Sequence, residues 1–208
     1  MFFEQIETAR ESGLLAGADE FRIHINGDFI PESMADNVSY WKNPNPEQEE
    51  SDTMRAIRDY ASQNPDDKIL YFHMKGIKSQ IAPAWPANPN GGTEFVTNWR
   101  RNMEHYVVKQ WEVCCKLLDH YDTVGCNYAL APRQHWSGGM WWANGNFINK
   151  LDHNLLETPS RWDREFWIGS GEGTFAELHH SGVDHYNVNY PPELWTPIPQ
   201  ELMEKING

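Results

Sequence analysis

Near the N-terminus, hydrophobic residues recur first at the spacing of a helix and then at the spacing of a strand. Apolar residues at positions 2, 3, 6 and 9 predict a helix over residues 2–15, with Gly13 placed to end it. Alternating apolar and polar residues predict a strand over residues 20–26. A second short strand is expected at residues 38–41, and a helix at residues 52–62.

The most apolar short segment covers residues 68–73. Ile69, Leu70, Tyr71 and Phe72 are consecutive there, which is typical of a strand buried on both faces. We therefore expect this strand to lie at the centre of the sheet.

The pattern after residue 79 predicts a loop, a long helix, a strand and two short helices. Residues 80–92 contain three prolines and two glycines without any period, so we expect a flap over the functional site. The long helix is predicted over residues 94–120 and the strand over residues 123–130. The short helices are expected near residues 146–151 and 161–168.

Alternating helices and strands are typical of α/β proteins, in which helices cover a mostly parallel sheet. The chain has 208 residues, the size of one domain, and it contains no internal repeat or interdomain linker. We therefore predict a single α/β domain over residues 1–208.

Charge and composition exclude several classes of function. The net charge is −13, and the 17 basic residues are scattered, which argues against a nucleic-acid surface. No apolar stretch approaches the ~20 residues that a membrane span needs. The three cysteines, at positions 114, 115 and 126, form neither a disulfide framework nor a zinc motif. Together these features predict a cytoplasmic protein, or one in the host cytoplasm if the source is viral.

The first candidate for chemistry is the end of the predicted strand at residues 68–73. His73 and Lys75 are two positions apart and would project to the same side, while Gly76 would allow close backbone approach. Ligands bind at this edge of open α/β sheets, so these residues could hold a diphosphate. The alternative is an ordinary strand end with a solvated lysine and a hydrogen-bonded histidine.

The second candidate is a glycine pair among aromatic residues at positions 135–143. Ser137, Gly138 and Gly139 offer backbone and hydroxyl groups to a phosphate or a sugar. Their aromatic neighbours offer stacking walls for sugar rings: Trp136, Trp141 and Trp142. The alternative is a tight turn with packed aromatic side chains.

Two further groups of polar residues follow. Asp163 and Glu165 could act as a base or bind an acceptor hydroxyl, although the same segment also fits an ordinary amphipathic helix. His179, His180 and His185 lie near Glu177, but their spacing does not match the helical zinc-hydrolase motif. Phosphate contacts or packing are therefore favoured over metal binding for these histidines.

Four segments together resemble glycosyltransferase domains of large algal viruses and their bacterial relatives. The segments are residues 71–76, Trp99-Arg100, residues 121–125 and residues 135–143, and the resemblance spans about residues 68–170. It implies a GT-A-like α/β/α sandwich that binds a UDP-sugar or a similar nucleotide-sugar. The implied donor-binding residues are His73, Lys75, Gly76, Ser137, Gly138 and Gly139. The implied sugar- and acceptor-binding residues are Trp136, Trp141, Trp142 and Arg100.

The chain departs from this family's usual pattern in two places. Domains of this family normally begin with a strand, whereas this chain begins directly with the helix that should follow it, predicted at residues 2–15. The usual Asp-x-Asp metal motif is absent, and His73-Met74-Lys75 takes its place. The cofactor is therefore left open, with Mn²⁺ or Mg²⁺ as candidates.

The leading hypothesis is transfer of a hexose or deoxyhexose from a nucleoside diphosphate sugar to a glycan acceptor. Lys75 and a histidine would neutralise the leaving diphosphate, while Asp163 or Glu165 would orient or deprotonate the acceptor. The alternative is a carbohydrate- or nucleotide-sugar-binding module without turnover. A histidine-dependent hydrolase is a weaker third reading, because no Gly-x-Ser-x-Gly motif is present.

Overall fold

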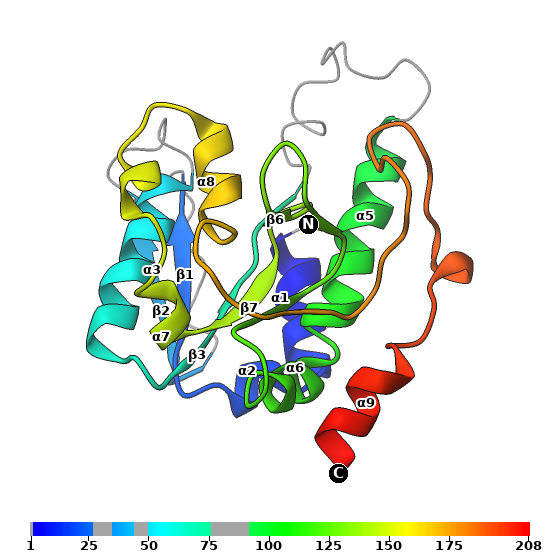
Figure 1. The fold of residues 1–208 in the computed structure, drawn as a ribbon, viewed down its shortest axis with the longest axis horizontal. Helices are drawn as coiled ribbons and strands as arrows, with labels where there is room; N and C mark the ends of the chain where they lie inside the picture. The colour runs from blue at the N-terminus through cyan, green and yellow to red at the C-terminus, as the bar shows by residue number, and fades with distance from the viewer. Residues whose placement is uncertain (1, 27–34, 44–49, 76–91) are drawn as a thin grey trace.

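The computed structural model describes residues 2–26, 35–43, 50–75 and 92–208 (Figure 1). Its helices are α1 Phe2–Glu11, α2 Leu14–Gly17, α3 Ser51–Gln63, α5 Gly92–Val107, α6 Trp111–Leu117, α7 Gly145–Ile148, η2 His153–Leu156, α8 Arg161–Trp167, η3 Pro192–Leu194 and α9 Gln200–Asn207. Its strands are β1 Phe21–Ile25, β2 Val38–Lys42, β3 Lys68–Tyr71, β4 Thr123–Gly125, β5 Tyr128–Ala129, β6 His135–Trp136, β7 Trp141–Asn144 and β8 Phe175–Glu177.

The described strands form three small sheets. The largest has the order β3-β7-β4-β8, in which β7 is antiparallel to both neighbours and β4 is parallel to β8. Strands β1 and β2 form a parallel pair, and β5 and β6 an antiparallel one. The fold is therefore mixed α/β, and the prediction of a mostly parallel central sheet is wrong. The chain between β4 and β7 contains only the β5–β6 pair and no crossover helix, so β7 returns antiparallel to β4.

The prediction for the strand at residues 68–73 is only partly confirmed. Strand β3 forms there, but it is an edge strand of the described four-stranded sheet. Ile69 and Leu70 are half-buried, and Tyr71 is buried. The apolar residues thus indicated that these side chains pack against neighbouring helices, but they did not indicate where the strand lies within the sheet.

Two long predicted elements are interrupted. The helix expected at residues 94–120 is divided into α5 and α6, and at the division the Lys109 amide donates to the Glu104 carbonyl, five residues back. The strand expected at residues 123–130 is divided into β4 and β5 by Asn127, whose φ is 56°. An isolated left-handed residue turns the chain sharply, and asparagine tolerates it better than most residues.

Helices lie on both sides of the four-stranded sheet (Figure 1), with α1, α5 and α6 on one side and α3, α7 and α8 on the other. Strand β7 shows why both sides are apolar. Trp142 packs into the core with α5 and α6, while Trp141 and Ala143 pack into the core with α7 and α8. Successive side chains of a strand point to opposite faces, so one short strand serves two cores.

Candidate functional site

The candidate site lies where the chain leaves the C-terminal end of β3. His73 Nδ1 is 3.0 Å from Glu50 Oε1 and 3.0 Å from the Tyr71 hydroxyl. A carboxylate oxygen only accepts hydrogen bonds, so Nδ1 carries the proton that is shared with Glu50. The other ring nitrogen, Nε2, is a buried atom without a hydrogen-bond partner among the described residues.

The Glu50 carboxylate is held in its charged form. Burial alone would raise its pKa, but the charge and hydrogen bond of His73 and the charges of Lys75 and Arg161 lower this pKa to about 2. Burial and the nearby Glu50 raise the pKa of Tyr71 well above its usual value. The end of β3 thus carries a fixed negative charge and a neutral phenol beside two cationic side chains.

Lys75 lies against aromatic rings. Its Nζ is 4.3 Å from the Trp99 ring centroid and 5.8 Å from that of Tyr186. No carboxylate within the described part of the chain forms an ion pair with it. The cation–π contact contributes about 0.5–2 kcal/mol and holds the ammonium close to the end of β3.

The glycine turn between β6 and β7 contacts both of these groups. Gly138 and Gly139 have φ values of 96° and 75°, a region that disfavours other residues. A Cβ on Gly139 would lie 3.4 Å from His73 Cε1, and one on Gly138 would lie 3.1 Å from Trp99 Cε2. The turn therefore approaches His73 directly and Lys75 through Trp99.

The turn offers fewer backbone donors than predicted. The Ser137 amide already donates to the Asn127 carbonyl, and the Gly139 amide donates to the Trp136 carbonyl. These two N–H groups are not free for a phosphate. The predicted donor residue Gly76 and the predicted flap at residues 80–91 lie outside the described residues.

Asp163 and Glu165 on α8 have different surroundings. Asp163 Oδ2 accepts from the Thr158 hydroxyl at 2.7 Å, and Oδ1 lies 3.2 Å from Arg133 Nη1, so both oxygens are occupied. With the described residues, Glu165 makes only a long ion pair of 3.5 Å, to Arg161. The charge of Glu165 also contributes to the raised pKa of Tyr71, so Glu165 acts electrostatically on the end of β3.

The predicted sugar-binding tryptophans require a correction. Trp136 is 0% exposed and Trp141 is 1% exposed, so both are core residues. Trp142 is also buried, and its indole N–H donates to the Val107 carbonyl at 2.7 Å. Burial of a large apolar ring with its N–H satisfied is the ordinary structural use of tryptophan, and it leaves no face for a sugar.

Arg100, predicted to bind sugar or acceptor, is also structural. It is buried in α5, where it forms ion pairs with Glu104 at 2.7 Å and Glu4 at 2.6 Å. The guanidinium therefore links α1 to α5.

The histidines near the C-terminus have separate structural contacts. His179 is buried and bonded to Thr196 and Tyr190, and exposed His180 pairs with Glu177 at 2.8 Å. His185 stacks on Trp99 at a centroid distance of 5.1 Å. The described residues contain no group of histidine, cysteine or carboxylate side chains that could hold a metal ion.

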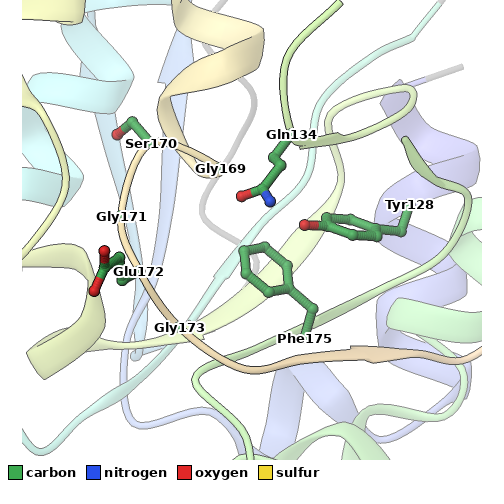
Figure 2. Close-up of a pocket in the computed structure, with 8 residues that line it drawn as sticks. All are labelled: Tyr128, Gln134, Gly169, Ser170, Gly171, Glu172, Gly173 and Phe175. Carbon is green, nitrogen blue, oxygen red and sulfur yellow. The ribbon is translucent and has the colours of Figure 1, made fainter. Parts of the chain in front are cut away.

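Two cavities flank the β5–β6 pair. One of about 370 Å³ is lined by residues of the glycine-rich loop after α8 together with Tyr128, Gln134 and Phe175. In Figure 2 the Tyr128 hydroxyl and the Gln134 amide point toward one another above the Phe175 ring, while Glu172 points away. The other cavity, of about 470 Å³, is lined by Ala131, Pro132, His135, Trp162, Glu165 and Phe166.

Neither of these cavities is lined by Gly138 or Gly139. The tryptophans of residues 136–142 fill the core and do not line a cleft, whereas a position of the two glycines at a cleft stays a prediction. Sequence reasoning also missed Glu50 and Trp162. Nothing in the local sequence distinguishes Glu50, because its contact with His73 joins segments that are distant along the chain. Trp162 is distinguished only by its exposure, which the sequence does not show.

The family described as a domain of unknown function (DUF8361) matches residues 35–157, more than half of the chain. The chain belongs to this family. The DUF8361 match includes β3, His73, Lys75 and the glycine turn, and it ends before α8 with Asp163 and Glu165. No curated protein and no solved structure matches the chain. None of the described helices has the length and apolar character that a membrane crossing requires.

Proposed function

We propose that this DUF8361 protein is a glycosyltransferase that moves a hexose or deoxyhexose from a nucleoside diphosphate sugar, in the first place a UDP-sugar, to a glycan acceptor. The observation that carries the proposal is the meeting of three segments at the end of β3. His73 and Lys75 leave the strand, the Gly138-Gly139 turn approaches them, and Glu165 lies close by on α8.

Each residue has a role that follows from its surroundings. Lys75 lacks an ion-pair partner among the described residues, so its ammonium is free to neutralise a leaving diphosphate. Nε2 of His73 has no partner in the same part of the structure, so the ring protonated at both nitrogens would donate from Nδ1 to Glu50 and from Nε2 to a phosphate oxygen. Glu165 is the better candidate base, because the oxygens of Asp163 are already occupied.

Helices on both faces of the four-stranded sheet support the α/β/α arrangement that a GT-A-like domain has. The described residues contain no group of side chains that fits a divalent cation, so we assign no role to Mn²⁺ or Mg²⁺ and test their effect by experiment. We place the reaction in the cytoplasm, and the three free thiols of Cys114, Cys115 and Cys126 support a reducing compartment.

A thermal-shift panel tests this proposal. UDP, UDP-hexoses and dTDP-deoxyhexoses are added with and without Mn²⁺, and ADP at equal concentration controls for general anion binding. A ligand that binds only the folded state raises the melting temperature, and the increase grows with the logarithm of the ligand concentration above Kd.

The proposal predicts a larger increase in melting temperature for UDP-containing ligands than for ADP at each concentration, and release of UDP from the UDP-sugar when a glycan acceptor is added. Binding without UDP release would favour the binding module without turnover. A flat response to every nucleotide would refute the donor site.

A further inference from the structure

The surface of the described residues contains one indole in an unusual setting. Trp162 on α8 is 54% exposed, whereas Trp136, Trp141 and Trp167 are completely or almost completely buried. The Arg161 guanidinium carbon lies 5.1 Å from its ring centroid. This contact orients the indole without covering it, as its exposure shows.

Trp162 forms part of the wall of the 470 Å³ cavity between α8 and the segment after β5. This volume falls within the ~300–1,000 Å³ range of small-molecule sites. Trp162, Pro132 and Phe166 provide apolar surface. Such surface suits the C–H face of a pyranose ring, in the way that aromatic rings pack against apolar groups elsewhere.

The polar groups of the cavity suit sugar hydroxyls. His135 donates from Nδ1 to the Arg133 carbonyl at 2.8 Å, so Nε2 is its second polar atom, and it has no partner among the described residues. Glu165 lies on the same wall. One acceptor nitrogen and one carboxylate beside apolar rings form the mixed lining that carbohydrate recognition requires.

The cavity is connected to the proposed donor site through Arg161 and Glu165. Arg161 lies against Trp162 and 3.5 Å from Glu165, and its charge acts on Glu50 at the end of β3. Glu165 in turn acts on Tyr71. Glu165 thus lines the cavity and also acts electrostatically on a residue at the end of β3.

We propose that this cavity is the acceptor subsite, in which a pyranose ring stacks on Trp162 and presents a hydroxyl to Glu165. The inference rests on the proposed glycosyltransferase function. In the transfer step the acceptor oxygen bonds to the anomeric carbon of the nucleoside diphosphate sugar, and its proton passes to Glu165. The bond from the anomeric carbon to the phosphate oxygen breaks, and the electron pair leaves with the nucleoside diphosphate.

Fluorine NMR on protein labelled with 5-fluorotryptophan tests this subsite directly. The Trp162 resonance is assigned by its absence from a Trp162→Phe variant. Methyl hexopyranosides and methyl 6-deoxyhexopyranosides are the probes, and UDP binding is measured in parallel. Titration with a binding glycoside is expected to shift the Trp162 signal and leave the buried indoles unchanged.

Variants give the expected magnitude. Trp162→Ala is expected to weaken glycoside binding about tenfold, while Trp162→Phe restores part of the affinity. Trp41→Ala is the matched control, since Trp41 is also partly exposed at 38% but lies on β2, outside the cavity. Glu165→Gln keeps the shape of the wall, so it is expected to retain glycoside binding and lose sugar transfer.

The outcomes are distinguishable. UDP binding without any response of Trp162 to the glycosides would overturn the acceptor subsite and leave the proposed donor site in place. A Trp162 response without UDP binding would overturn the transferase and support a sugar site in this cavity. No response in either measurement would overturn both.

Discussion

Replacement of Gly138 by alanine is the most informative perturbation of the glycine turn. Gly138 has a φ of 96°, and an added Cβ would overlap Met103 Sδ and lie 3.1 Å from Trp99 Cε2. Met103 and Trp99 are 0% and 3% exposed, so neither side chain has room to move away. The substitution thus combines backbone strain with overpacking.

The two costs can be estimated separately. A left-handed conformation costs an alanine about 1–2 kcal/mol. Extra atoms in a packed core cost about 1–3 kcal/mol. Gly138→Ala is therefore expected to lower the free energy of unfolding by about 2–5 kcal/mol.

Gly182 provides the matched control for the backbone cost. Its φ is 71°, and nothing lies within 4 Å of an added Cβ, so Gly182→Ala should cost only about 1–2 kcal/mol. Urea unfolding followed by tryptophan fluorescence measures both variants. Equal losses of stability for Gly138→Ala and Gly182→Ala would refute the packing of the turn against Trp99.

Three other predictions concern buried charge and pH. Arg100→Met leaves the buried carboxylate of Glu104 without its ion-pair partner and should lower the free energy of unfolding in urea by about 3–5 kcal/mol. Arg101→Met removes an exposed ion pair with Glu4 and should lower it by no more than ~1 kcal/mol. The pKa of Glu50 is lowered from 4.5 to about 2, so its stabilisation is present above pH 4.5 and is lost as pH falls toward 2; Glu50→Gln should flatten that part of the stability profile. Burial lowers the pKa of His185 from 6.5 to about 4, so this residue should reduce stability as pH drops from 6.5 to 4. Burial lowers the pKa of His24 to about 4 as well, so the decline in His185→Phe should become shallower without disappearing.

Local patterns predicted those elements that depend mainly on local sequence. Alternation in residues 20–26 corresponds to β1, and the helical spacing in residues 52–62 and 161–168 corresponds to α3 and α8. The order of the sheet could not be predicted, because it depends on pairing between distant segments. Strand β7 lies between β3 and β4 and runs against both, which no local period indicates.

The candidate site was predictable to the same degree. His73 and Lys75 were found because they follow an apolar strand, and the turn at Gly138 because two glycines interrupt an aromatic segment. The roles of the tryptophans were not predictable from composition. Trp136 and Trp162 both have polar neighbours in the sequence, yet one fills the core and the other is 54% exposed. Whether a tryptophan side chain is exposed depends on which face of its segment packs against the sheet.

Calorimetric titration of the Lys75→Met variant with UDP and with uridine tests whether Lys75 contacts the donor diphosphate. Methionine is one heavy atom shorter than lysine, so it keeps most of the apolar side chain while removing the charge. A charge-assisted contact to a phosphate contributes about 1.5–3 kcal/mol, so UDP affinity should fall about ten- to a hundredfold. Lys150→Met, at an exposed lysine outside the site, is the control.

We expect Lys75→Met to weaken UDP binding strongly and to leave uridine binding nearly unchanged, and we expect Lys150→Met to affect neither. An equal loss for UDP and uridine, or no loss for either, would contradict a diphosphate contact at Lys75 and place the donor site elsewhere.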